Sequence, residues 1–288
     1  MRTTKINIVT VNSGWILQKI AERIHNELKN LCESSISHEP DETADANFYV
    51  DVQNCFFGPT KTFDIGYFTH VHENNPQWIN PTWFQLDYIM HMCTRYYDMF
   101  SNYYPKEKMQ VAYQGQMESA FTLKKPVLGV FQRGGFEGKG EGVMHNLISR
   151  PCMKNYKLLF VGGGWENVMR ACEQAGVEAE HVTDESYENY PAHYDRIDYL
   201  LIPSLWEGGP MSPIEAYAKG IPIIGSNVGV IGEDLEIDYM YEPGDINALE
   251  GILDSIMEEP LKRRKKVADL SWKKYAETLL QVVQQHTK

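Results

Sequence analysis

The sequence has no long, uncharged hydrophobic run. No window of about 18 residues is apolar throughout, and that is the length a membrane-spanning helix needs. The N-terminus has neither the longer apolar segment nor the small-residue cleavage site of a secretory signal, because residues 1–5 lead directly into a strand-like stretch. We therefore expect no transmembrane segment and a cytoplasmic location.

Cysteine is scarce, and its spacing fits no common framework. The five cysteines are odd in number and spread along the chain, with no Cys-x-x-Cys pair. Such a distribution is typical neither of a disulfide-bonded domain nor of a thiolate zinc site. We expect reduced, mostly buried thiols and no metal held by them.

Positive charge is also in deficit. The 27 Lys and Arg residues face 39 Asp and Glu residues, for a net charge of −12. An acidic chain is repelled by a phosphate backbone, so non-specific nucleic-acid binding is not expected. The basic cluster at 262–266 is flanked by acidic residues in a helical context and predicts a solvated helix face.

Short β-branched and aliphatic runs alternate with helical patterns along the whole sequence. This alternation is typical of βαβ units with parallel sheets, and 288 residues suffice for two domains of about 100–150 residues each. We predict an α/β fold with one domain over 1–117 and another over 126–270. The expected strands are 6–11, 46–52, 65–71, 109–113, 127–131, 158–162, 181–183, 199–203 and 221–225. The expected helices are 16–31, 83–97 with a short strand near 88–93, 142–149, 166–175, 187–193, 213–219, 249–258 and 271–285.

A glycine-rich loop with two cations follows the strand expected at 127–131. Ligands of parallel sheets bind beyond the carboxyl ends of the strands, and Arg133 and Lys139 in this loop could converge there on a diphosphate. It is not a Walker A loop, because Arg133 stands where the first glycine is needed and Gly140 where Ser or Thr is needed. The plain alternative is a surface turn with exposed cations.

Two carboxylates flank a later loop-to-helix junction. Glu207 follows a strand, Glu215 lies in the first turn of a helix, and Gly208 and Gly209 free backbone NH groups to face a ligand. For Glu215 a structural role is equally open. Ser212 and Glu215 have the spacing of a capping box, in which the carboxylate serves only the helix start.

These residues carry a family resemblance. Glu207 and Glu215, within 203–208 and 215–222, resemble the paired glutamates of retaining GT-B glycosyltransferases of glycosyltransferase family four, in the glycosyl transferases group 1. Arg133 and Lys139 resemble the Arg and Lys pair of the family. Weaker signals follow in the family's order: Asn12-Ser13-Gly14, His72-Glu73, 111–115, 159–164 and Ser271-Trp272.

The resemblance implies a GT-B fold and a transferase activity. It implies two Rossmann-like domains whose parallel sheets face a central cleft, with a shortened N-terminal domain and a C-terminal helix, 271–288, that crosses back to it. The implied reaction moves a sugar from a nucleotide-diphosphate donor to an acceptor hydroxyl with retention of anomeric configuration. It needs no divalent metal and no cofactor beyond the donor substrate.

The resemblance also implies roles for individual residues. Arg133 and Lys139 would hold the donor diphosphate, Glu215 the ribose hydroxyls, and Glu207 the transferred sugar. His72 would be the active-site histidine of the first domain. The remaining implied donor-binding residues are Ser13, Gly14, Asp184, Gly208, Gly209, Pro210 and Met211.

Other functions remain open at this stage. The acceptor is a saccharide, a lipid, a protein or a modified nucleobase. The short first half leaves room for a nucleotide-sugar-binding protein without transferase activity. His70 and His72 lie on one side of a strand, as ligands of a metal-dependent hydrolase would. A dinucleotide oxidoreductase is disfavoured, because the glycines at 162–164 lack the third glycine of GxGxxG.

Overall fold

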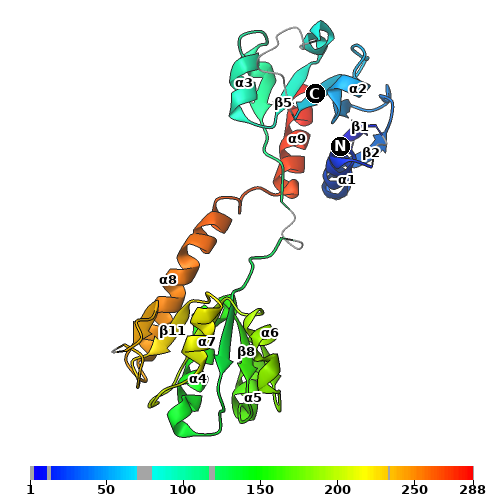
Figure 1. Cartoon of the computed structure of the whole chain (residues 1–288). Coiled ribbons are helices and arrows are strands. Elements are labelled where there is room, and N and C mark those ends of the chain that lie inside the picture. The colour runs from blue at the N-terminus through cyan, green and yellow to red at the C-terminus, as the bar shows by residue number, and fades with distance from the viewer. Residues whose placement is uncertain (1–2, 12–13, 70–79, 117–120, 233, 288) are drawn as a thin grey trace. The chain divides into compact units, whose positions relative to one another are not determined.

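The structure of the protein is a computed structural model that describes residues 3–11, 14–69, 80–116, 121–232 and 234–287. It divides into two compact units (Figure 1). Unit 1 comprises Met1–Thr122 together with Lys265–Lys288, and unit 2 comprises Leu123–Arg264. Each unit contains one six-stranded sheet, so each is described here by itself.

Unit 1 is a parallel sheet with the strand order β2-β1-β3-β4-β5-β6. Its elements, in chain order, are β1 (Lys5–Val9), α1 (Ile16–Leu28), β2 (Glu33–Ser37), β3 (Ala46–Tyr49), α2 (Val52–Cys55), β4 (Phe63–Phe68), a 3-10 helix (Pro81–Gln85), β5 (Tyr88–His91), α3 (Thr94–Phe100), a second 3-10 helix (Lys106–Lys108), β6 (Met109–Val111) and α9 (Trp272–His286). Its central strands β1, β3, β4 and β5 are almost entirely buried, so the sheet needs cover on both faces.

The closing helix α9 supplies part of that cover. Ser271 caps its start, with its Oγ accepting a hydrogen bond of 3.1 Å from the backbone NH of Lys274. The helix places an apolar stripe against α1 and the sheet, and the core of unit 1 includes Leu279 and Val283 together with Ile6 and Phe48. The last part of the chain therefore completes the core that the first part begins.

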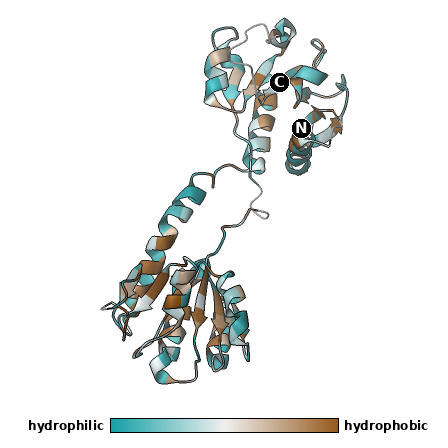
Figure 2. Cartoon of the chain, viewed as in Figure 1, coloured by the Kyte–Doolittle hydropathy of each residue, from teal (hydrophilic) through white to brown (hydrophobic). Residues whose placement is uncertain are grey.

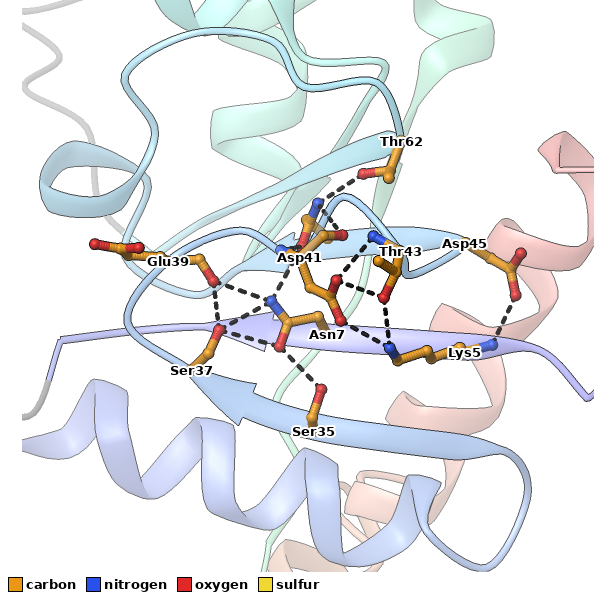
Figure 3. A network of polar contacts seen from close by, with 10 residues as sticks. Lys5, Asn7, Ser35, Ser37, Glu39, Asp41, Thr43, Asp45 and Thr62 are labelled. Atoms are coloured by element: carbon orange, nitrogen blue, oxygen red, sulfur yellow. Dashed lines mark hydrogen bonds and ion pairs between the residues drawn. The ribbon is translucent and has the colours of Figure 1, made fainter.

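The connection between β2 and β3, residues 38–45, contains no helix, and buried amides fix it instead (Figure 3). Asn7 and Asn47 face each other on neighbouring strands, and the Asn7 amide donates to the Asn47 side-chain oxygen at 3.1 Å. That oxygen also accepts from the backbone NH of Asp41 at 2.8 Å, and the Asn7 oxygen accepts from the Ser37 hydroxyl at 3.0 Å. Paired in this way, the two buried amides hold the loop over the sheet without a desolvation penalty.

His91 is buried at the end of β5 without full hydrogen bonding. Its ring lies among Phe68, Tyr97 and Phe100, its Nε2 is 3.4 Å from the Met109 sulfur, and its Nδ1 has no hydrogen-bond partner among the described residues. Burial lowers the pKa of His91 to about 4, because the imidazolium form would lose its hydration.

This burial predicts an acid-sensitive stability. The unfolded chain takes up a proton on His91 below a pKa of about 6.5, whereas the folded chain does so only near 4, so stability is lost as the pH falls through this window. Between pH 7 and pH 5 the loss amounts to about 2 kcal/mol. Urea unfolding of the wild type and of His91→Phe at both pH values measures it, and the variant should lose less stability than the wild type. An equal loss in both proteins would contradict the prediction.

Unit 2 is a second parallel sheet, with the strand order β12-β11-β10-β7-β8-β9. Its elements, in chain order, are β7 (Val127–Phe131), a 3-10 helix (Glu137–Lys139), α4 (Glu141–Ile148), a 3-10 helix (Pro151–Asn155), β8 (Lys157–Val161), α5 (Glu166–Ala175), β9 (Glu178–Val182), a 3-10 helix (Tyr187–Asn189), α6 (Tyr190–Tyr194), β10 (Tyr199–Ile202), α7 (Ser212–Ala218), β11 (Ile223–Ser226), β12 (Tyr239–Tyr241) and α8 (Ile246–Lys265).

Both faces of this sheet are buried. Along β8, Leu158 and Phe160 belong to one hydrophobic cluster, while Leu159 and Val161 belong to the other. This alternation follows from the two-residue period of a strand, and hydrophobic colours dominate the strands of unit 2 (Figure 2). With its faces covered by helices, the sheet leaves the ends of its strands for ligands.

The predicted α/β class with two Rossmann-like units on parallel sheets, the composition of a GT-B fold, is confirmed. The edge strands β2 and β12, the short helix α2 and several 3-10 helices were missed. The helix predicted at 83–97 is instead a 3-10 helix, the strand β5 and the start of α3. The helix predicted at 187–193 is instead a 3-10 turn followed by α6, and the one predicted at 249–258 is the longer α8, which contains Pro260.

Three of the five cysteines are buried and the other two half-buried, all with free thiols, as predicted. The basic cluster at 262–266 is exposed, also as predicted. Among the residues that the structure describes, every helix is too short or too polar to span a bilayer.

Candidate functional site

The carboxyl ends of the strands of unit 2 gather most of the predicted site residues. Arg133 and Lys139 follow β7, Asp184 follows β9, and Glu207 follows β10, while Glu215 lies in the first turn of α7. Because all these strands run parallel, the residues after them lie at one edge of the sheet, where open α/β sheets bind their ligands.

The loop after β7 packs directly against the loop after β8. The Gly134 NH donates to the Gly163 carbonyl at 2.8 Å, and a Cβ on Gly134 would come within 2.5 Å of the Gly164 carbonyl oxygen. The indole NH of Trp165 adds a bond of 2.8 Å to the Gln132 carbonyl. Glycine is thus needed here for close approach of two backbones, which fixes where the cation-bearing loop begins.

Gln132 links that loop to the strand end of β10. Its amide nitrogen donates to the Lys139 carbonyl at 2.7 Å, and its amide oxygen accepts from the hydroxyl of buried Ser204 at 3.1 Å. The Ser226 hydroxyl in turn donates to the Ser204 carbonyl at 2.6 Å. These hydrogen bonds connect β7, β10 and β11 and fix the position of the Lys139 backbone.

Lys139 and Glu207 form the central contact of the site. The Lys139 ammonium group donates to the Glu207 carboxylate in an ion pair, although 68 residues separate them. Their side chains are 30% and 14% exposed, so the pair is half-buried but still open to solvent. A cation and a carboxylate held together at a strand edge form a polar centre that can meet a charged ligand.

Gly138 and Trp206, which directly precede Lys139 and Glu207 in the sequence, pack against each other. The Leu205 NH donates to the Gly138 carbonyl at 2.8 Å, and a Cβ on Gly138 would lie 2.4 Å from the Trp206 ring. The exposed ring of Phe136 meets Trp206 edge-on, with their centroids 6.5 Å apart. The loops that carry Lys139 and Glu207 therefore also hold an exposed aromatic pair, Phe136 and Trp206.

Glu215 does not serve as a capping residue. The residue at the N-cap of α7 is Met211, and Ser212 is already the first helical residue and makes no side-chain cap, so the capping-box alternative is wrong. The Glu215 carboxylate instead accepts hydrogen bonds from the Tyr187 hydroxyl and, at 2.7 Å, from the Tyr194 hydroxyl.

The remaining predicted residues of unit 2 lie on its surface. Arg133 is exposed and forms no ion pair within the described part of the chain. Asp184 is exposed with a φ of 56°, a left-handed conformation that is uncommon for a residue other than glycine. Gly208, Gly209 and Met211 are also exposed, and Pro210 is half-buried. The structure thus pairs Lys139 with Glu207, while Arg133 and Glu215 make separate contacts.

Of the site residues predicted in the first half of the chain, Gly14 is the one that lies among the described residues of unit 1. Gly14 is exposed, has a φ of 66°, and donates from its backbone NH to the Gln18 side chain at 2.8 Å. Ser13, His70 and His72 lie outside the described residues. Within the described ranges, the structure groups no three His, Cys, Asp or Glu residues as metal ligands would be.

Three contacting residues were missed from the sequence: Gln132, Tyr187 and Tyr194. From the sequence, Gln132 and Tyr194 had no predicted role, and Tyr187 was placed only in the expected helix 187–193. A usable signal existed for Gln132, because it directly follows a buried strand. None existed for the tyrosines, whose contact with Glu215 depends on how α6 and α7 pack.

A doubly covered parallel sheet with a cation-carboxylate pair at its strand ends defines unit 2 as a Rossmann-like unit. Residues 144–277 match the family described as "Glycosyl transferases group 1". The predicted resemblance to this group is confirmed over that segment, whereas glycosyltransferase family four specifically stays a prediction. The matched segment includes Glu207, Glu215 and Asp184, and Arg133 and Lys139 precede it.

Two curated relatives match parts of the chain. The MMP alpha-(1->4)-mannosyltransferase of Mycolicibacterium hassiacum is 32% identical over 91 residues, covering 27% of this chain and 22% of the relative. The lipopolysaccharide core biosynthesis mannosyltransferase LpsB of Rhizobium meliloti is 36% identical over 47 residues, covering 16% and 13%. The matches therefore span less than a quarter of either relative.

Solved structures align over nearly the whole chain. The apo form of the lipopolysaccharide outer core galactosyltransferase WaaB is 14% identical with a TM-score of 0.42, covering 97% of this chain and 99% of that one. Anabaena Alr3699/HepE in complex with UDP and glucose is 12% identical with a TM-score of 0.41, covering 99% and 98%.

Proposed function

We propose that the protein is a glycosyltransferase that takes a sugar from a nucleotide-diphosphate donor bound by unit 2 and moves it to an acceptor hydroxyl. The Lys139–Glu207 ion pair carries this proposal, because it stands at the strand edge of a unit whose larger part matches glycosyl transferases group 1. The mannosyltransferase relatives and the UDP-bound neighbour agree with a nucleotide-sugar donor.

The chemistry follows from where charge develops. When the anomeric bond breaks, negative charge builds on the leaving diphosphate, and a preorganised cation next to it lowers the barrier. Lys139 is preorganised by Gln132 and by Glu207, and Arg133 on the same loop is a cation without a partner among the described residues. Donor binding would draw Lys139 to the phosphates, which releases Glu207 to accept a hydrogen bond from a sugar hydroxyl.

Retention of configuration and independence of metal ions belong to the same proposal. In this scheme Arg133 and Lys139 stabilise the negative charge on the diphosphate, as a divalent ion does in metal-dependent enzymes. The leaving diphosphate helps to deprotonate the acceptor hydroxyl. Glu207 either orients the sugar or acts as a nucleophile, and its release from Lys139 serves both roles. The acceptor class stays open among saccharides, lipids, proteins and modified nucleobases.

A two-stage experiment tests the proposal. UDP-, GDP- and ADP-sugars are screened by thermal shift, and the best binder is then assayed for hydrolysis and transfer with and without a chelator. We expect at least one donor to raise the melting temperature, because a ligand at 100 times its Kd adds about 2.7 kcal/mol of stability. Turnover should survive the chelator and yield a product with the donor's anomeric configuration.

Each of the other outcomes of this experiment contradicts one part of the proposed function. Binding without turnover across acceptor classes would indicate a nucleotide-sugar-binding protein. Copurified zinc and loss of activity with the chelator would indicate a metal-dependent hydrolase. The absence of any donor that shifts the melting temperature would reject the proposal as a whole.

A further inference from the structure

Two tyrosine hydroxyls bind one carboxylate at the start of α7. Tyr187 donates to Oε1 of Glu215 and Tyr194 donates to its Oε2. Each oxygen of the carboxylate thus has a phenol donor, and the two donors come from consecutive elements, the 3-10 turn after β9 and helix α6. An ionised carboxylate offers about four acceptor positions, so room for two further donors remains.

Tyr194 is fixed in the core. Its side chain is 2% exposed, and its ring stacks on Phe131 with centroids 4.2 Å apart and an interplanar angle of 21°. Burial, helped by the bond to Glu215, raises its pKa well above the usual range, so the phenol stays protonated and remains a donor. Tyr194 therefore fixes the position of the Glu215 carboxylate from the inside.

Tyr187, unlike Tyr194, lies on the surface and is held by few contacts. It is 62% exposed, it lies in a three-residue 3-10 turn, and its only ring contact in the described structure is with Tyr190. A single hydrogen bond from an exposed side chain adds little net stability, since water replaces it readily. Tyr187 can therefore leave Glu215 without disturbing the core.

A pocket of about 220 Å³ opens between α6 and α7 beside this carboxylate. Three tyrosines form one part of its wall, and its lining residues are Tyr187, Tyr190, Pro191, Tyr194, Glu215, Ala218 and Lys219. A ligand that brings hydroxyl groups to Glu215 would meet Tyr187 as the movable part of that wall.

We propose that Tyr194 is a positioning residue that sets Glu215 to receive a vicinal diol, and that Tyr187 is a built-in competitor whose hydroxyl the diol displaces. The inference rests on the proposed function, in which the diol belongs to the ribose of a nucleotide donor. It assigns the two tyrosines opposite effects on affinity. Loss of the Tyr194 hydroxyl weakens diol binding, and loss of the Tyr187 hydroxyl strengthens it.

The test uses Tyr187→Phe and Tyr194→Phe, two matched variants that each remove one hydroxyl and keep the ring. Calorimetry measures the Kd of UDP, GDP and ADP and of their 2′,3′-dideoxy analogues for both variants and the wild type. For the tightest-binding nucleotide we expect Tyr194→Phe to raise the Kd about 5-fold and Tyr187→Phe to lower it about 3-fold, the sizes expected for one net hydrogen bond. Neither variant should change the Kd of the dideoxy analogue.

The dideoxy comparison separates positioning from general damage. Equal changes with both ligands would show that the tyrosines act only on the fold, and weaker diol binding by Tyr187→Phe would show that it is no competitor. A wild type that binds nucleotide and dideoxy analogue equally would overturn this inference and leave the proposed function standing. A wild type that binds no nucleoside diphosphate would overturn both.

Discussion

Replacing Lys139 with methionine is expected to lower kcat/KM for sugar transfer by on the order of 10²–10³-fold, the usual cost of removing one preorganised charge-stabilising group. The methionine keeps the length of the side chain but removes the charge next to the leaving diphosphate. It also leaves the Glu207 carboxylate, 14% exposed, without its ion-pair partner. Steady-state kinetics with the best donor of the screen measures the loss.

Lys124→Met is the matched control. Lys124 also forms an ion pair, with Asp198 at 3.1 Å, but its side chain is exposed and belongs to the connection before β7. Exposed ion pairs contribute about 0–1 kcal/mol, so this variant should keep kcat/KM within about twofold. A Lys139→Met enzyme as active as the control would remove the ion pair from the mechanism.

Glu207→Gln extends the same test to the carboxylate. The amide keeps hydrogen-bonding capacity but loses the charge that holds Lys139. If Glu207 only orients a sugar hydroxyl, the amide should retain part of the activity, whereas a nucleophilic role requires the carboxylate itself. The transfer rate of Glu207→Gln relative to the wild type therefore distinguishes a sugar-orienting Glu207 from a nucleophilic one.

Replacing Gly140 with alanine is expected to destabilise the protein by at least about 3 kcal/mol, because it combines two costs. Gly140 has a φ of 79°, where a side chain costs roughly 1–2 kcal/mol. A Cβ there would also lie 2.0 Å from the Pro203 carbonyl oxygen, so the backbone must shift. Since Gly140 directly follows Lys139 and precedes α4, we expect transfer activity to fall together with stability.

Gly142→Ala, two residues further on, is the control for this effect. Gly142 lies inside α4, and a Cβ there would meet nothing within 4 Å. Alanine at an open helix position should raise stability by about 0.5–1 kcal/mol. Equilibrium urea unfolding of both variants measures the two changes. If the two variants changed the free energy of unfolding by the same amount and in the same direction, backbone strain at Gly140 would not be needed to shape the loop.

The sequence predicts most of the fold because the buried strands are marked by composition. β7, β8 and β10 are short, largely apolar runs followed by Gln132, Gly162 and Pro203, and all three were expected near their observed positions. β2 was missed because it is a partly buried edge strand of sequence ESSIS. Its sequence contains no apolar run from which a strand could be predicted. Polar edge strands gain their stability from pairing, which a local pattern does not reveal.

The site was predictable only in part for a related reason. Lys139 and Glu207 follow β7 and β10, which are neighbours in the sheet, so placing both after parallel strands was enough to expect their convergence. The contacts of Glu215 were not predictable, because Ser212 and Glu215 have capping-box spacing and the two tyrosines come from the 3-10 turn after β9 and from α6. Local spacing was overridden here by packing between α6 and α7.

The place of α9 in unit 1 has a consequence for how the protein is made. Unit 2 is one continuous segment, Leu123–Arg264, whereas unit 1 needs residues from both ends of the chain. During synthesis the hydrophobic surface that Leu279 and Val283 cover stays open until these two residues have been added to the chain. Unit 2, a continuous segment made before them, is therefore able to fold on the ribosome before unit 1 closes.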